Sequence, residues 1–389
     1  MDIEAPQSIE APPSPEPTVN PLRFNGNGAE YFRIWIVNLM LTIVTLGIYS
    51  AWAKVRRLQY FYRNTELAGT GFEYHGQPKA ILVGRAIALL MFLAYQYSAE
   101  VSLWLFGVVV VVLLVVWPWL LHNSLRFRLH NSSYRGLRFQ FVGSLGGTYL
   151  ASYRQLVIML VMFAAVGLLA LVSKTAATFA GFAAALAVVF WVYPAWYRDF
   201  KQFQHNHTQY GQQRFQFSTT IRKFSWIFSM VFLQAIVIFI VAAITIAALG
   251  IEFPKAGAEA DGAPSPKGFK SIAILLTFVY GGLFLVCIPY FRARVDNLIW
   301  NNTRFDGGHF ESRQEAHKLA GIYFTNLIGV ALTLGFFMPW AMVRLARYRA
   351  ECLSLTLTAP LDDIVAAPSD EVGAIGEEAG SVFDIDVAL

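Results

Sequence analysis

The sequence predicts an all-α integral membrane protein, a multi-pass helical bundle of repeated units with short cytoplasmic β-strands between the units. Three observations predict this class. Of the 389 residues, 56% are hydrophobic and only 14% are charged. The mean hydropathy is +0.48. Eight apolar segments follow one another, each close to the roughly 20 residues that a helix needs to cross a bilayer. The composition excludes an ordinary soluble enzyme, because too little polar chain remains to cover these segments.

The apolar segments lie between two acidic ends. Acidic residues in both ends are not balanced by any Lys or Arg, which favours solvated, disordered tails. We therefore expect tails over 1–21 and 356–389, the first also rich in proline, and a membrane domain over 22–355. The apolar segments lie near 33–52, 80–97, 101–121, 154–172, 177–197, 226–250, 271–291 and 321–342.

Four longer connections between the segments are basic, and basic connections stay on the cytoplasmic side of the membrane. Arginines in these connections are expected at the depth of the lipid headgroups, where each contributes about 1 kcal/mol with anionic lipid. These candidate lipid contacts are Arg56, Arg57, Arg126, Arg128, Arg292 and Arg294. Tryptophans at the apolar ends form an aromatic belt rather than a surface for stacking nucleic-acid bases, so we expect no nucleic-acid partner.

One pattern recurs in the basic connections. A proline or an Ala-Trp pair marks the end of the apolar segment, and an amphipathic basic stretch follows. An Asn with a Gly five residues later comes next, at Asn64, Asn131, Asn206 and Asn302. We expect the proline to end the spanning helix and the basic stretch to lie in the headgroup plane. We expect Phe72–Tyr74, Phe139–Phe141 and Phe215–Phe217 to form short strands paired with one another.

The first and last apolar segments resemble each other. Residues 33–62 and 321–350 share 11 identities in 30, including Thr-Leu-Gly at 45–47 and 333–335. Each terminal unit has one apolar segment where the middle units have two. If every strand and basic stretch is cytoplasmic, 33–52 and 321–342 are re-entrant helical elements flanking six full spans. The rival topology has eight full spans and both termini in the periplasm.

Few polar residues lie within the apolar segments. Asn38 and Asn326 occupy equivalent places in the two related units and could hydrogen-bond to each other or contact a substrate. Arg85 lies near the start of its segment, from where its guanidinium can reach the interface. These three residues are the candidate intramembrane polar contacts.

A family resemblance rests on particular residues. The run Tyr31-Phe32, Asn38, Thr45-Leu46-Gly47-Ile48-Tyr49 and Trp52 is similar to YjgN-like bacterial inner-membrane proteins, as are the later Arg-Phe-Gln-Phe strands at 138–141 and 214–217. The resemblance covers roughly 22–355. It implies a multi-pass inner-membrane protein and no known activity, because the family's function is unknown.

No motif of a phosphate-binding loop, zinc protease or nucleophile elbow is present in the sequence. We therefore expect no catalytic, metal or cofactor site. Two function classes remain, with a small-solute transporter or channel placed first. The other is a non-catalytic organiser that binds anionic lipid or a protein partner through its basic cytoplasmic face. A polar cavity reaching the middle of the spans would favour transport, and a solid bundle beneath a basic platform would favour the organiser.

Overall fold

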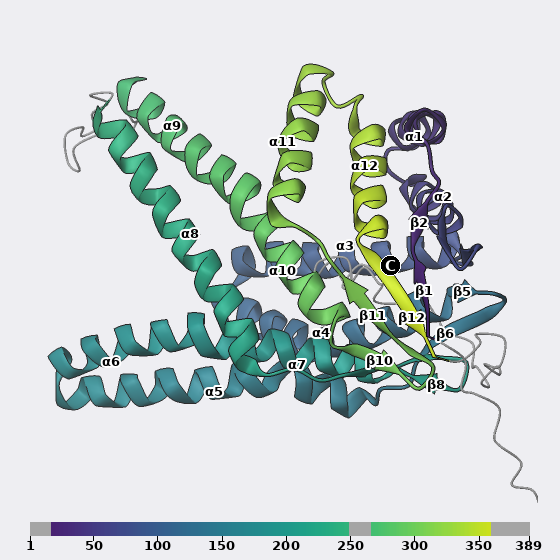
Figure 1. The fold of residues 1–389 in the computed structure, drawn as a ribbon. Helices are drawn as coiled ribbons and strands as arrows, with labels where there is room; N and C mark the ends of the chain where they lie inside the picture. Colours follow the sequence, from purple (N-terminus) through teal and green to yellow (C-terminus); the bar gives the residue numbers. More distant parts are fainter. Residues whose placement is uncertain (1–16, 249–265, 359–389) are drawn as a thin grey trace, which may run out of the picture.

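The computed structural model describes residues 17–248 and 266–358 (Figure 1). Helices extend from a small β-barrel, so the predicted all-α class is too narrow even though the protein is mostly helical. The helices are α1 Gly28–Val44, α2 Ser50–Arg63, α3 Pro78–Val101, α4 Leu103–His130, α5 Leu145–Val172, α6 Lys174–Ala187, α7 Tyr193–Asn206, α8 Ile221–Ala248, α9 Pro266–Gly282, α10 Ile288–Trp300, α11 Ala316–Leu332 and α12 Met338–Glu351.

Six helical stretches in the described residues are long and apolar enough to cross a membrane. They are α3, α4, α5, Lys174–Asn206, α8 and Leu275–Trp300. The turns between α3 and α4 and between α5 and α6 each use a single serine. The side chains of Ser102 and Ser173 accept hydrogen bonds from the backbone N–H groups of Leu105 and Ala176, at 3.1 and 3.3 Å. Each serine thereby caps the start of the returning helix, and a multi-pass helical protein results.

The spanning helices do not end at their prolines, so that prediction is wrong. Pro118 lies inside α4. Pro194 and Pro289 follow directly on two five-residue π-helical segments, η1 Val188–Val192 and η2 Leu283–Cys287. A π-helical turn shifts the hydrogen-bond ladder by one residue, which accommodates the missing proline N–H without breaking the helix. The basic stretches of α4, α7 and α10 are therefore the ends of candidate spans and continue as far as the barrel, whereas the first basic stretch lies on α2.

The terminal units each fold into a helical hairpin. The first helix ends at Thr45-Leu46-Gly47, where Leu46 and Gly47 have positive φ of 49° and 92°. The Thr45 hydroxyl donates to Leu41 O at 2.7 Å and accepts from Tyr49 N–H at 2.9 Å, so it ends α1 and begins α2. Thr333 does the same between α11 and α12. The shared Thr-Leu-Gly sequence thus specifies the reversal seen between α11 and α12 in Figure 1.

Neither α1 nor α11 is among the six candidate spans. Each has 17 residues, which corresponds to about 25 Å of helix against a bilayer core of roughly 30 Å. Two helical hairpins and six spans are what the re-entrant hypothesis requires. Whether the two terminal hairpins are re-entrant, and on which side of the membrane each terminus lies, stay predictions.

The strands form two antiparallel sheets, ordered β1-β12-β11-β10-β9 and β2-β3-β4-β5-β6-β7-β8. The strands are β1 Thr18–Pro21, β2 Arg23–Phe24, β3 Thr65–Leu67, β4 Thr70–Tyr74, β5 Ser132–Tyr134, β6 Leu137–Phe141, β7 Thr208–Tyr210, β8 Gln213–Arg214, β9 Gln216–Phe217, β10 Thr303–Phe305, β11 Gly308–Ser312 and β12 Leu353–Leu357.

The two sheets join into a closed barrel. Leu22 alone separates β1 from β2, and Phe215 alone separates β8 from β9. Both residues stay in the hydrogen-bond ladder, because Leu22 N–H donates to Leu353 O at 2.9 Å and Phe215 N–H donates to Thr208 O at 3.0 Å. The pairing of the described strands therefore leaves no free edge.

The two ends of the membrane domain meet in this barrel, because Thr18 of β1 pairs with Leu357 of β12. Residues 18–21 and 356–357, which the sequence analysis placed in the tails, form barrel strands. The rest of the predicted tails, 1–16 and 359–389, lies outside the described residues.

The Phe-x-Phe segments are extended, but the prediction that they pair with one another is wrong. Phe72 pairs with Tyr134, and Phe139 pairs with Tyr210. Phe217 pairs with Thr303. Each segment is the second strand of a hairpin closed by a two-residue turn, such as Ala68-Gly69. Its own first strand occupies one edge, so its other edge is left for the first strand of the next hairpin.

Candidate functional site

A cavity of about 840 Å³ extends from the barrel lumen to the space between α2, α7, α10 and α12. We call it the barrel cavity. Its lining includes strand residues, the barrel ends of these four helices, and residues farther along α8, η2 and α10.

The floor of the barrel cavity is a layer of apolar strand side chains. They are Leu67, Phe72, Tyr134, Phe139, Tyr210, Phe215, Phe305, Phe310 and Leu355. Neighbouring rings touch, with centroids 4.7 Å apart for Phe72 and Tyr134 and 4.9 Å apart for Phe139 and Tyr210. The hydroxyls of Tyr134 and Tyr210 donate to the backbone carbonyls of Leu67 and Tyr134, at 2.6 and 3.0 Å. The polar tips are satisfied, so the floor is a packed apolar layer.

The walls come from one face of each lining helix. The lining residues of α2, α7, α10 and α12 lie 3–4, 7–8, 11–12 or 15 residues before the strand that follows each helix. Side chains at this spacing lie on one side of an α-helix. The hydroxyls of Thr65, Thr208 and Thr303 donate to carbonyls four residues earlier at 2.8–2.9 Å, so each helix reaches its strand without a loop. The same helical face therefore points into the barrel each time.

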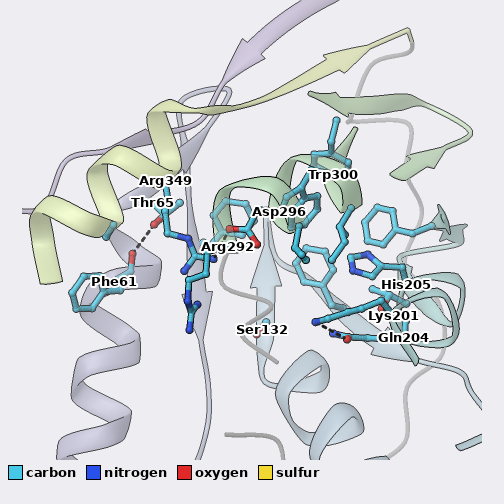
Figure 2. A pocket seen from close by; sticks show the side chains of 18 of the residues that line it. Phe61, Thr65, Ser132, Lys201, Gln204, His205, Arg292, Asp296, Trp300 and Arg349 are labelled. Atoms are coloured by element: carbon cyan, nitrogen blue, oxygen red, sulfur yellow. Dashed lines mark hydrogen bonds and ion pairs between the residues drawn. The ribbon is translucent and has the colours of Figure 1, made fainter. Parts of the chain in front are cut away.

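Four cations from four different helices line the barrel cavity: Arg57 of α2, Lys201 of α7, Arg292 of α10 and Arg349 of α12. We call them the cationic band. Among the described lining residues, Asp296 of α10 is the one carboxylate, which leaves an excess of three formal positive charges. Figure 2 shows Arg292, Arg349 and Asp296 on one side of the cavity and Lys201 with Gln204 on the other.

Several contacts hold the cationic band in place. The Arg349 guanidinium lies 3.5 Å from Asp296 Oδ2, which also accepts from Gln314 Nε2 at 3.1 Å. Lys201 is only 9% exposed, and its ammonium donates to Gln204 Oε1 at 3.4 Å. Lys201 Nζ also lies 5.9 Å from the centre of the Tyr197 ring. These contacts hold Arg349 and Lys201, two of the four cations, in place at the cavity lining.

The positive charge of Arg57 also affects the pKa of Tyr31 on the neighbouring α1. Burial raises the pKa of Tyr31 to about 12, and the positive charge of Arg57 opposes this rise. Tyr31 stacks on Tyr60, with ring centroids 5.1 Å apart. The α1–α2 hairpin therefore packs beside the cavity wall.

Farther from the barrel the lining becomes apolar. Val231 of α8, Leu283 and Cys287 of η2 and Ile288 of α10 line this part, which we call the apolar chamber. The Cys287 thiol is buried and donates to Val231 O at 3.9 Å, joining the two helices across the chamber. Polar side chains thus lie near the barrel, and apolar ones lie deeper in the spans.

The structure divides the six arginines predicted to contact lipid headgroups. Arg57 and Arg292 line the barrel cavity. Arg56 and Arg294 are exposed on the outside, each guanidinium 5.6 Å from a tyrosine ring centre, Tyr49 and Tyr290 respectively. The remaining two are half-buried on α4 and are not among the described lining residues: Arg126 and Arg128.

The predicted intramembrane polar residues do not come together. Asn326 Nδ2 donates to Ala341 O at 3.2 Å, and its Oδ1 accepts from Arg344 at 2.9 Å, within its own hairpin. Asn38 is buried, and its Oδ1 has no hydrogen-bond partner.

The reason is that the two terminal hairpins meet through α1, which carries Asn38, and α12, where Phe32 packs on Trp340. Asn326 lies on α11 instead. Arg85 donates to the Ser50 hydroxyl and so joins α3 to the start of α2.

The sequence analysis did not single out Lys201, Asp296 or Arg349. The feature that identifies them as lining residues is their distance in sequence from the strand that follows their helix. Lys201 and Asp296 lie seven residues before that strand, and Arg349 lies four residues before it. That count requires the strand starts, which only the structure defines.

Comparisons with known proteins point to one group. Residues 19–382 match the family described as "Bacterial protein of unknown function (DUF898)". A Salmonella typhimurium LT2 relative named "Inner membrane protein YjgN" is 24% identical over 351 residues, covering 85% of this chain and 87% of its own length. Relatives of the same name from Escherichia coli O157:H7 and K12 are 31% and 32% identical over 131 residues. The matched part spans 33% of this chain and 33% of each E. coli protein. No solved structure matches this chain.

Proposed function

We propose that this chain, which belongs to the DUF898 family of bacterial proteins of unknown function, binds the anionic group of a membrane-associated ligand in its barrel cavity. It is a protein of the bacterial inner membrane, as its relatives' names and its six candidate spans indicate. The proposed role is the binding of a ligand at one defined site. It differs from a nonspecific attraction of anionic lipid to the basic cytoplasmic face.

The observation that carries the proposal is the convergence of the cationic band on one cavity. Arg57, Lys201, Arg292 and Arg349 come from four helices and face one carboxylate among the described lining residues. Lys201 is buried, Arg292 and Arg349 are half-buried and Arg57 is exposed. Like charges that line one cavity repel one another, and an opposite charge that enters the cavity offsets this repulsion. Guanidinium groups bind phosphate and carboxylate through paired hydrogen bonds. An anion in this space would offset the charge excess.

The lining supports binding rather than catalysis. Ser132 and Cys287 are the serine and the cysteine among the described lining residues. The Ser132 hydroxyl donates to Arg128 O at 2.8 Å and lies within hydrogen-bond distance of the Tyr62 hydroxyl, at 3.2 Å. The Cys287 thiol donates to Val231 O. Both groups are engaged with neighbouring helices instead of a general base.

We also infer that the barrel cavity is built by repeated units. Thr65, Ser132, Thr208 and Thr303 each begin a strand and donate to the carbonyl four residues earlier, at 2.8–2.9 Å. Each of these strands leads into a two-residue turn. The common geometry supports a common unit.

Transport of a small solute is the second candidate, and the depth of the cavity favours it, because the lining extends into the spans. Two features weigh against it. The deep part is apolar, and a solute path through the barrel would require the aromatic floor to open. Anion binding needs no such movement.

Native mass spectrometry of the purified protein tests the proposal. Wild type should carry a co-purified anionic molecule. The Arg57→Gln/Arg292→Gln variant should lose most of it, because each charge-assisted hydrogen bond contributes about 1.5–3 kcal/mol, or tenfold and more in affinity. Arg56→Gln/Arg294→Gln is the matched control and should retain it. Equal loss in both variants would show that surface charge alone holds the ligand.

A further inference from the structure

We propose that the ligand is an anionic lipid of the surrounding leaflet, with its headgroup at the cationic band and an acyl chain in the apolar chamber. This inference rests on the proposed function and assigns the chemistry of the ligand. A free organic anion and a lipid share the anionic group, but only the lipid brings a hydrocarbon chain.

The first step is the position of the apolar chamber along the spans. Val231 lies ten residues into α8, roughly 15 Å from its barrel end at a rise of about 1.5 Å per residue. Leu283 lies 17 residues before Trp300, roughly 25 Å from the barrel end of α10. A bilayer core is about 30 Å thick, so the chamber reaches the depth at which acyl chains lie.

The second step is the order of polarity. Arg57, Lys201 and Arg349 lie four to eight residues before their strands. Along α10 the order is the same, because Arg292 lies 11 residues before β10, whereas Cys287 and Leu283 lie 16 and 20 residues before it. Charge is therefore nearest the barrel, and apolar lining lies deeper in the spans. A lipid in one leaflet has the same order, with its headgroup at the surface and its chain toward the centre. A lipid can enter the cavity without turning over.

The third step is the cost of leaving the apolar chamber to water. Val231, Leu283 and Ile288 offer a water molecule no side-chain hydrogen bond. A hydrocarbon chain removes this apolar surface from water. The spans that form the chamber expose most of their surface, with only 11% of the α8 and Leu275–Trp300 windows buried, so lipid chains are adjacent.

The test uses the full-length protein in vesicles containing phosphatidylglycerol with a diazirine on one acyl chain. After illumination, peptide mass spectrometry should place adducts on residues 283–288 and on Val231. Adducts there should fall about tenfold in Arg57→Gln/Arg292→Gln and stay unchanged in Arg56→Gln/Arg294→Gln. Leu283→Phe and Cys287→Phe, which fill the chamber, should each reduce these adducts while leaving glycerol phosphate binding unchanged. Size-exclusion profiles show whether each filling variant is folded. If one is not, the positions of the adducts on the wild-type protein still test the proposal.

The outcomes separate the two claims. Adducts confined to outward-facing positions such as Phe239, with Arg57-dependent binding of glycerol phosphate, would overturn the lipid assignment and leave anion binding intact. If neither lipid adducts nor glycerol phosphate binding depends on Arg57 and Arg292, the proposed function itself fails.

Discussion

The barrel and the spans are stabilised in different ways. Barrel strands from residues as distant as Thr18 and Leu357 pair side by side, and the barrel core is buried by the protein itself. The spans have only 6–17% of their apolar windows buried inside the protein and extend outward as hairpins in Figure 1. Tertiary specificity therefore concentrates in the barrel, whereas the spans depend on lipid to cover them.

Glycine positions give the sharpest contrast between the two regions. A Cβ at Gly308 in β11 would lie 2.3 Å from the backbone oxygen of Thr356 in β12. We expect Gly308→Val to separate these strands, at a cost of more than about 4 kcal/mol, and to open the barrel. A Cβ at Gly167 in α5 meets nothing within 4 Å, so Gly167→Ala should be neutral or slightly stabilising. Thermal unfolding in detergent measures both; equal effects would contradict the comparison.

Aromatic truncation gives the next largest difference. Phe310 is 5% exposed in the barrel core and packs against Trp300, with ring centroids 4.9 Å apart. Phe310→Ala should cost about 3–5 kcal/mol. Phe239 of α8 is 58% exposed, so Phe239→Ala should cost less than about 1 kcal/mol. Resistance to denaturant of the two variants can be compared directly. A larger loss of unfolding free energy for Phe239→Ala than for Phe310→Ala would show that the spans, and not the barrel, contain the stabilising core.

The sequence predicted the parts of this fold that depend on local patterns. Helix positions follow from apolar runs, and the Thr45-Leu46-Gly47 reversal follows from a motif shared with residues 333–335. The extended Phe-x-Phe segments follow from alternation and a nearby glycine turn. These features involve residues that are close in the chain.

The missed features involve residues that are distant in the chain. The alternation of apolar and polar residues predicts a strand but does not specify which strand it pairs with. The closure of the barrel through Leu22 and Phe215 was therefore not predictable from one sequence. The continuation of helices through Pro194 and Pro289 depends on π-helical segments that lack a sequence signature. The cationic band was missed for the same reason: neighbours such as Arg56 and Arg57 are chemically alike, and only the barrel decides which of them lines the cavity.

A smaller effect is expected at the hydroxyls that join helix to strand. Thr303 is buried, and its hydroxyl donates to Ile299 O at 2.8 Å. Thr303→Val keeps the shape of the side chain and removes this hydrogen bond, at a cost of about 0.5–1.5 kcal/mol. Thr245 in α8 donates to Val241 O but is only half-buried, so Thr245→Val is the control and should cost less than Thr303→Val. Chemical denaturation of both variants decides whether the barrel junction is the sensitive place.

The smallest expected effect concerns the reversal between α1 and α2. Leu46 has φ of 49° and is 94% exposed. Leu46→Gly should relieve backbone strain and raise the free energy of unfolding by about 0.5–1 kcal/mol. A loss of stability would show that the Leu46 side chain gains more from lipid at the hairpin tip than the strained backbone costs.

The most direct test of anion binding in the barrel cavity is a high-resolution structure of the protein in nanodiscs of phosphatidylglycerol. The account predicts density within hydrogen-bond distance of Arg57, Lys201 and Arg292, extending toward Cys287. Density of equal strength at Arg56 or Arg294 is not expected. A resolved cavity with no ligand density at Arg57, Lys201 and Arg292 would contradict the account.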